Sequence, residues 1–164
     1  MGNQSIRSSE DIEAVLRRYA NMVYRLALTQ TKRKADADDV FQEVFLRLVV
    51  RERTFESEEH LKAWLIRVTI NCSRKWFRAA RLGRLLSLDH EPAQADAPGS
   101  SEVLEAVMAL PRQYRTVIHL FYYEDLSIAR ISEILQIPES TIKSQLARAR
   151  RMLRKHLEEE MADV

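Results

Sequence analysis

The sequence predicts an all-α protein built from two small helical domains, on three observations. Only three glycines and four prolines interrupt 164 residues, so helix formers dominate and alternating strand patterns are scarce. Apolar residues recur at helical spacing along most of the chain. One stretch, SLDHEPAQADAPGSS at 87–101, has two prolines, small residues and no apolar periodicity, which is typical of a flexible tether. We therefore expect domains at 8–84 and 102–158, joined by a flexible linker at 85–101.

Three helices are expected in the N-terminal domain, at about residues 9–32, 36–51 and 58–82. The first carries Leu16, Tyr19, Val23 and Leu26 on one stripe, and acidic residues begin the second, where the helix dipole favours them. Residues 53–57, RTFES, are expected to form a loop before the third helix. The buried side of that third helix is predicted to consist of Leu61, Leu65, Val68, Cys72 and Trp76, which makes Cys72 a small core residue.

The second helix has more apolar residues than one core requires. Val40, Phe41, Val44 and Leu48 share one face, yet Leu46 and Val49 project from the opposite one. Polar residues surround that second apolar surface, namely Asp39, Gln42 and Glu43. The pattern indicates either a protein-docking surface or a helix buried on two sides, and both interpretations stay open.

A second face of the third helix is basic. Arg67, Asn71, Arg74 and Arg78 recur at i, i+4, i+7 and i+11, and residues 66–84 contain six cations without one acid. An unbalanced basic stripe suits a nucleic-acid backbone, and the adjacent loop at 53–57 could hold an unstacked base. A solvated helix face is the alternative.

The C-terminal domain is predicted to contain four helices. Val103, Leu104, Val107 and Met108 belong to the first, and Pro111 opens the second. The third runs from 127 to 135 with Ser127 as its N-cap, and the turn Gln136-Ile137-Pro138 ends it. The fourth begins near Glu139.

The last two of these helices have the pattern of a helix-turn-helix. Ile142, Leu146, Ala149 and Leu153 form one stripe of the final helix. The opposite face combines small polar residues with cations: Ser140, Ser144, Ala147, Arg148, Arg151 and Lys155. Such a helix can enter a DNA major groove while its arginines neutralise phosphates. An αα-hairpin with a solvated basic face is the alternative.

Several classes of protein are disfavoured by the composition. A single cysteine, Cys72, cannot form an intramolecular disulfide, and we find neither a signal peptide nor an apolar run of membrane-spanning length, so we expect a cytoplasmic protein. The four histidines are dispersed, and no glycine-rich phosphate loop is present. We therefore expect no enzymatic activity, no metal, no cofactor and no small-molecule substrate.

Long motifs resemble the sigma factors of bacterial RNA polymerase. LPRQYRTVIHLFYYEDLSIARISEILQIPESTIKSQLARARRML is similar to their C-terminal promoter-binding domain. DADDVFQEVFLRLV resembles their core-binding helix, and FESEEHLKAWLIRVTINCSRKWFR resembles their promoter-melting segment. The two-domain layout is that of the extracytoplasmic-function (ECF) group, and the resemblance extends from about residue 10 to 157.

This resemblance implies three sets of site residues. The core-polymerase set, which would dock on the clamp helices of the largest subunit, is Asp39, Gln42, Glu43 and Leu46. The −10 set, including the loop at 55–59, would bind and melt the downstream promoter element: Phe55, Ser57, Arg67, Asn71, Arg74, Lys75 and Arg78. The −35 set would bind the upstream element: Ser140, Thr141, Lys143, Ser144, Gln145, Arg148 and Arg151. The implied partners are core RNA polymerase, with its flap region facing the C-terminal domain, promoter DNA and an anti-sigma factor.

Three positions depart from the family pattern. Gln136 replaces a frequent glycine in the turn, which costs about 1 kcal/mol if the residue is left-handed. Gln145 replaces a frequent arginine, and glutamine pairs with adenine. Ala129-Arg130 replaces a usually acidic pair. The last two departures mean that a promoter sequence cannot be borrowed from relatives.

Two other functions would use the same motifs. A stand-alone helix-turn-helix repressor would dimerise to match two half-sites, but it needs neither a second basic stripe nor a docking helix. An adaptor that only sequesters a partner would leave that second stripe unused.

Overall fold

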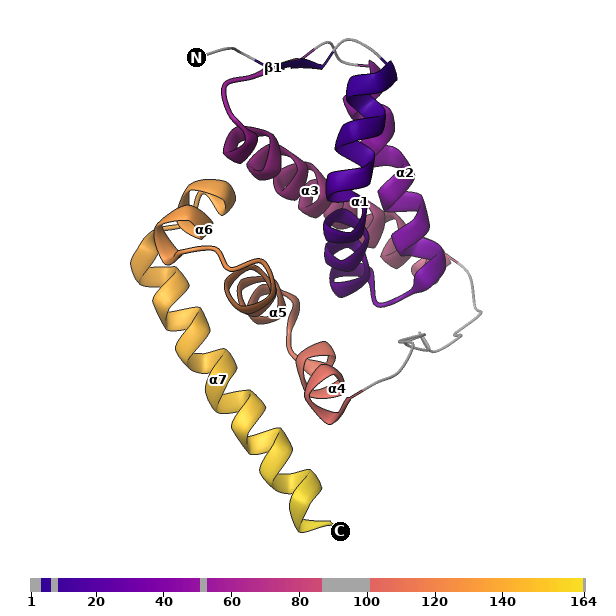
Figure 1. Cartoon of the computed structure of the whole chain (residues 1–164). Helices are drawn as coiled ribbons and strands as arrows, with labels where there is room; N and C mark the ends of the chain where they lie inside the picture. The colour runs from indigo at the N-terminus through magenta and orange to yellow at the C-terminus, as the bar shows by residue number, and fades with distance from the viewer. Residues whose placement is uncertain (1–3, 7–8, 51–52, 87–100, 164) are drawn as a thin grey trace. The chain divides into compact units, whose positions relative to one another are not determined.

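The structure is a computed structural model that describes residues 4–6, 9–50, 53–86 and 101–163 (Figure 1). The chain divides into two compact units, Met1–Ala95 and Asp96–Val164, called unit 1 and unit 2 below. Most of the predicted linker, residues 87–100, lies outside the described residues. Nearly all of the described chain is helical, as predicted.

Unit 1 is a three-helix bundle of α1 (Ser9–Thr31), α2 (Lys34–Val50) and α3 (Glu58–Leu86). Each helix packs against the other two, and Figure 1 shows them side by side. The shared core is aliphatic and includes Leu26, Leu48 and Leu65. Helix α1 ends where Lys32 takes a positive φ of 65°, and the tight turn that follows starts α2 only two residues later. The apolar stripes predicted from helical spacing therefore meet in one core.

The structure differs from the prediction in the loop before α3. Residues Arg53–Phe55 form a short strand, β2, which pairs antiparallel with β1 (Gln4–Ile6) near the N-terminus. Gln4 faces Phe55 in this register, and Ile6 faces Arg53. Three-residue strands are too short to show a period of two, so hydrophobic patterning could not predict them.

Unit 2 is organised around one long helix. Figure 1 shows α7 (Glu139–Ala162) running through the unit, and α4 (Glu102–Ala109), α5 (Arg112–Ile118) and α6 (Ile128–Leu135) all contact it. The expected second helix is α5 continued by a π-helical turn, η1 (His119–Tyr123). Leu120, Ile131, Ile142 and Leu146 fill the core.

A buried guanidinium joins α4 to α5. Arg115 is almost completely buried and donates to the carbonyl oxygens of Leu110 (2.9 Å) and Met108 (3.4 Å), which lie at the end of α4. Burial, together with the nearby charge of Arg112, lowers the pKa of Arg115 to about 10. This contact satisfies carbonyls that a helix C-terminus leaves without partners.

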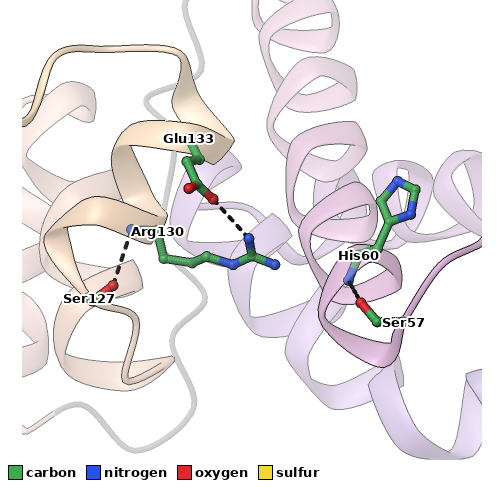
Figure 2. A network of polar contacts seen from close by, with 5 residues as sticks. All are labelled: Ser57, His60, Ser127, Arg130 and Glu133. Atoms are coloured by element: carbon green, nitrogen blue, oxygen red, sulfur yellow. Dashed lines mark hydrogen bonds and ion pairs between the residues drawn. The ribbon is translucent and has the colours of Figure 1, made fainter. Parts of the chain in front are cut away.

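The turn between α6 and α7 confirms two details predicted from the sequence. The Ser127 hydroxyl accepts a hydrogen bond from the Arg130 backbone N–H (3.1 Å), so Ser127 is the N-cap of α6 (Figure 2). Gln136 is left-handed, with φ 56° and ψ 45°, and ends α6. Pro138 then precedes α7, where its missing N–H costs nothing.

Candidate polymerase-docking and nucleic-acid interfaces

The exposed face of α7 combines small polar side chains with cations. Ile142, Leu146 and Ala149 are buried, and this fixes the rotation of the helix about its axis. Of the predicted −35 set, five residues are exposed together on the other side: Ser140, Lys143, Ser144, Arg148 and Arg151. Small side chains at Ser140 and Ser144 leave room for a groove edge to approach beside Lys143, and the two arginines follow further along the helix.

Two members of the −35 set, Thr141 and Gln145, lie at the border between this face and the core. Both are half-buried. The carboxamide oxygen of Gln145 is buried and accepts no hydrogen bond within the part of the chain that the structure describes. A buried acceptor without a donor is unfavourable.

Arg150 is an arginine of α7 that does not belong to this face. Its Nε donates to the Tyr122 hydroxyl at 2.7 Å, and its guanidinium lies 5.7 Å from the Phe121 ring centroid and 5.6 Å from that of Tyr122. Cation–π contacts of this kind keep the charge against η1. This agrees with the helical spacing, which leaves Arg150 out of the face that contains Arg148, and the structure adds the contacts that Arg150 makes instead.

On α6, the departure at Ala129-Arg130 is compensated locally. The Arg130 guanidinium forms an ion pair with Glu133 one turn later, at 2.8 Å (Figure 2). An i,i+3 pair between partly exposed groups contributes only a few tenths of a kcal/mol, ~0.3. It nevertheless balances the extra positive charge on α6.

In unit 1, the predicted basic stripe of α3 is exposed as a whole. Its residues are Arg67, Asn71, Arg74, Lys75 and Arg78. Leu65, Val68 and Cys72 are buried on the other side of the same helix. The helix thus has one core face and one face suited to a phosphate backbone.

Phe55, which the resemblance assigns to the −10 set, is buried in unit 1. Its side chain is only 1% exposed, and its ring packs edge-on against His60 (5.3 Å between centroids) and Trp64 (5.6 Å). Phe55, a member of the predicted −10 set, therefore packs its ring into the core and does not present it to DNA in this structure. The exposed residues of this loop are Thr54, Glu56 and Ser57.

The docking surface predicted on α2 is open to solvent. Leu46 is 60% exposed, Val49 52% and Val50 77%, while the Val40, Val44 and Leu48 side chains are buried. The alternative of a helix buried on two sides is therefore wrong. Asp39 and Gln42 are exposed beside these residues, so an apolar surface rimmed by polar groups is available to a protein.

Glu43, the fourth member of the docking set, is more restrained than the others. Its carboxylate forms an i,i+4 ion pair with Arg47 at 2.8 Å. Burial raises the pKa of the neighbouring Cys72 thiol, and the Glu43 carboxylate adds to that rise. Cys72 is the buried core residue that the sequence predicts, and it is not poised to react.

Sequence reasoning missed the contacts that restrain the start of α3. Glu58 accepts from Arg18 and from the Tyr19 hydroxyl (2.6 Å), both on α1. Burial and this bond raise the pKa of Tyr19 to about 12. Ser57 and His60 form a capping pair whose spacing was visible in the sequence.

Neither a metal cluster nor a membrane helix is found in residues 4–6, 9–50, 53–86 and 101–163. No group of three or more potential metal ligands gathers among them, and none of their helices is long and apolar enough to cross a bilayer.

Both units match families of known proteins. The family described as Sigma-70 region 2 matches residues 15–82, and Sigma-70, region 4 matches residues 100–153. The ECF RNA polymerase sigma factor SigM of Bacillus subtilis is 32% identical over 152 residues, which cover 87% of this chain and 93% of SigM. The chain belongs to the ECF sigma factors. It directs promoter-specific initiation of transcription by RNA polymerase.

Other ECF sigma factors are similar along most of the chain. SigW of Bacillus subtilis is 28% identical over 158 residues, covering 85% of this chain and 84% of SigW. Among solved structures, the sigma factor RpoE from Bartonella quintana, determined with the anti-sigma factor NepR, has a TM-score of 0.71 at 23% identity. That match covers 91% of this chain and 98% of RpoE. CnrH, determined with the cytosolic domain of CnrY, has a TM-score of 0.63 at 22% identity, and both structures show the same fold.

Proposed function

We propose that the three exposed surfaces divide the work of this sigma factor. Helix α2 binds core RNA polymerase, α3 with its preceding loop binds and melts the −10 element, and α7 binds the −35 element. The observation that supports this division is that the exposed basic stripe of α3 and the basic face of α7 lie on different units, while the exposed apolar residues Leu46 and Val49 lie on α2. The functional domains in this proposal are 8–84 and 102–158, joined by a linker at 85–101.

The docking surface would use Asp39, Gln42, Glu43 and Leu46 against the clamp helices of the largest subunit. Leu46 supplies apolar area, and exposed Gln42 and Asp39 supply hydrogen bonds at its rim. Unit 2 would contact the flap region of the polymerase, so that both domains bind the same enzyme.

The −10 surface would consist of Ser57 and the exposed stripe of α3, without Phe55 as a direct contact. A stripe of cations can follow the phosphates of one strand while the loop receives an unstacked base. Opening is then driven by binding free energy, and neither a catalytic residue nor a cofactor is required.

The −35 surface would use the exposed residues of α7. Arg148, Lys143 and Arg151 would neutralise phosphates, while Gln145 and Ser144 face base edges. Glutamine pairs in a bidentate manner with adenine, so we expect an A·T pair opposite Gln145.

An anti-sigma factor is the regulatory partner we propose. Solved structures of similar fold were determined with such factors bound, NepR on RpoE among them. The protein would act in the cytoplasm, where its promoters are, and a membrane-anchored anti-sigma factor would hold it inactive there.

The test is co-elution of this protein with bacterial core RNA polymerase, followed by transcription from genomic fragments. We expect a stable complex and sharply positioned new start sites, each preceded by two shared sequence elements. If the protein does not co-elute with the polymerase but binds duplex DNA as a dimer in a gel-shift assay, it is a repressor. The docking role of α2 would then be refuted.

A further inference from the structure

The first turn of α3 contains a variant of the capping box. Ser57 is the residue before the helix, and its hydroxyl accepts from the backbone N–H of His60 at 3.1 Å (Figure 2). In the usual box, a Glu or Gln three residues after the cap returns a hydrogen bond to the backbone N–H of the cap residue itself. Here the third position is His60, and its ring replaces the carboxylate or carboxamide.

The ring bonds to a different residue than the usual box does. His60 Nδ1 accepts from the backbone N–H of Glu56 at 3.2 Å, one residue further from the helix than Ser57. This bond needs a lone pair on Nδ1, so it forms with the tautomer that carries its proton on Nε2. The side chain therefore restrains the loop itself and not only the helix end.

The same ring also restrains the loop through Phe55. The two rings meet edge-on at 5.3 Å, and Trp64 packs against Phe55 from the next turn of α3. On its other side the loop is held by the pairing of β2 with β1. Thr54, Glu56 and Ser57 are thus exposed on a backbone that is paired and packed in the absence of DNA.

We propose that His60 is a positioning residue, which holds residues 54–57 in the conformation that receives an unstacked promoter base. This inference rests on the proposed role of the loop in the −10 element. A loop that is already ordered binds without the entropic cost of ordering itself. His60 therefore favours the open promoter complex without touching DNA.

The variants isolate the acceptor on the ring. His60→Leu keeps an apolar contact with Phe55 but cannot accept from Glu56, whereas His60→Gln keeps a side-chain acceptor at this position, within reach of the backbone N–H groups just before α3. His156→Leu is the matched control, since His156 is a half-buried histidine of α7 paired with Glu160 at 3.1 Å.

Each variant is assembled with core polymerase, and opening is followed by permanganate reactivity of thymines and by 2-aminopurine fluorescence in the −10 element. We expect His60→Leu to lower the equilibrium fraction of open complex by about tenfold, the effect of one lost cap interaction. His60→Gln should return to within about threefold of the parent, and His156→Leu should equal it. Because the lost bond also belongs to the free fold, the melting temperature of the free protein should fall by no more than about 5 °C. Core affinity should stay unchanged, and a parallel fall in core affinity would overturn the proposal in favour of a purely structural role.

A scan with abasic nucleotides separates this proposal from the function on which it rests. One abasic site at a time is placed in the non-template strand of the −10 element. The parent protein should show one position where the abasic site impairs opening, and that penalty should disappear in His60→Leu. If the parent shows no such position, base capture by the loop is wrong and the role of His60 falls with it. If the penalty persists undiminished in His60→Leu, base capture stands and the positioning role of His60 is refuted.

Discussion

Helices α3 and α7 each present cations opposite a buried apolar stripe, but the surroundings of these cations differ, and the proposed function assigns them to different forms of DNA. On α7, small residues precede the cations, and a fixed turn at Gln136 sets the angle at which the helix leaves α6. On α3, the cations follow a loop whose backbone is restrained by β1, Phe55 and His60. A single recognition helix can bind duplex DNA in the major groove. Binding of single-stranded DNA also requires a site that receives an unstacked base.

The largest expected effect tests whether polymerase docking is separate from the two helices, α3 and α7, that we propose to bind DNA. The double variant Gln42→Ala with Leu46→Asp should lower affinity for core polymerase by about 100-fold, because it places a charge in an apolar contact. Titration of fluorescently labelled protein with core enzyme measures this. Val103→Asp, a comparably exposed apolar residue of α4, should leave the affinity unchanged, and equal losses in both variants would contradict the role of α2.

The next effect tests whether Arg148 on α7 contacts a phosphate of the −35 element. Arg148→Ala should weaken binding to a duplex −35 element by about tenfold and reduce the salt slope of log K by about one, since one phosphate contact is lost. Fluorescence anisotropy over a salt series measures both quantities.

Arg150→Ala is the internal control for that experiment. Arg150 is bonded to Tyr122, so its removal should change the salt slope by much less. If both arginines give the same slope change, the distinction between the two faces of α7 is wrong. Core affinity should be unaffected by Arg148→Ala.

A smaller effect concerns which base α7 prefers. Gln145→Arg should shift preference at one position of the −35 element from A towards G by about fivefold, because arginine pairs with guanine and glutamine with adenine. Competitive binding to a set of −35 duplexes that differ at one position measures the ratio. A uniform gain for all sequences would show that residue 145 contacts only phosphate.

The smallest expected effect concerns the free energy of unfolding and the turns that follow α1 and α6. Gln136 and Lys32 both have positive φ, 56° and 65°. Gln136→Gly and Lys32→Gly should each raise the free energy of unfolding by up to about 1 kcal/mol, because glycine adopts this conformation without the clash of a Cβ. Urea denaturation measures the gain, and promoter selectivity should not change. Destabilisation by either substitution would show that the lost side-chain contacts outweigh the relief of strain.

The sequence by itself determined the features that depend on local spacing. Helical periodicity predicted which faces of α2, α3 and α7 are buried, and it predicted the second apolar surface at Leu46 and Val49. The cap at Ser127 and the end of α6 at the turn Gln136-Ile137-Pro138 follow from residue type and position along the chain, whereas the left-handed conformation of Gln136 is known only from the structure. These features need no information about distant segments.

Only the tertiary structure decided which distant groups meet. It paired β1 with β2 across nearly fifty residues, and the core took up Phe55, so that the loop presents its neighbours instead. It also placed Tyr122 of η1 against Arg150 of α7, which lie 28 residues apart in the sequence. A helical pattern predicts which side of a helix is buried. Which residues cover that side depends on how distant segments pack together, and the spacing of residues within one helix does not determine that packing.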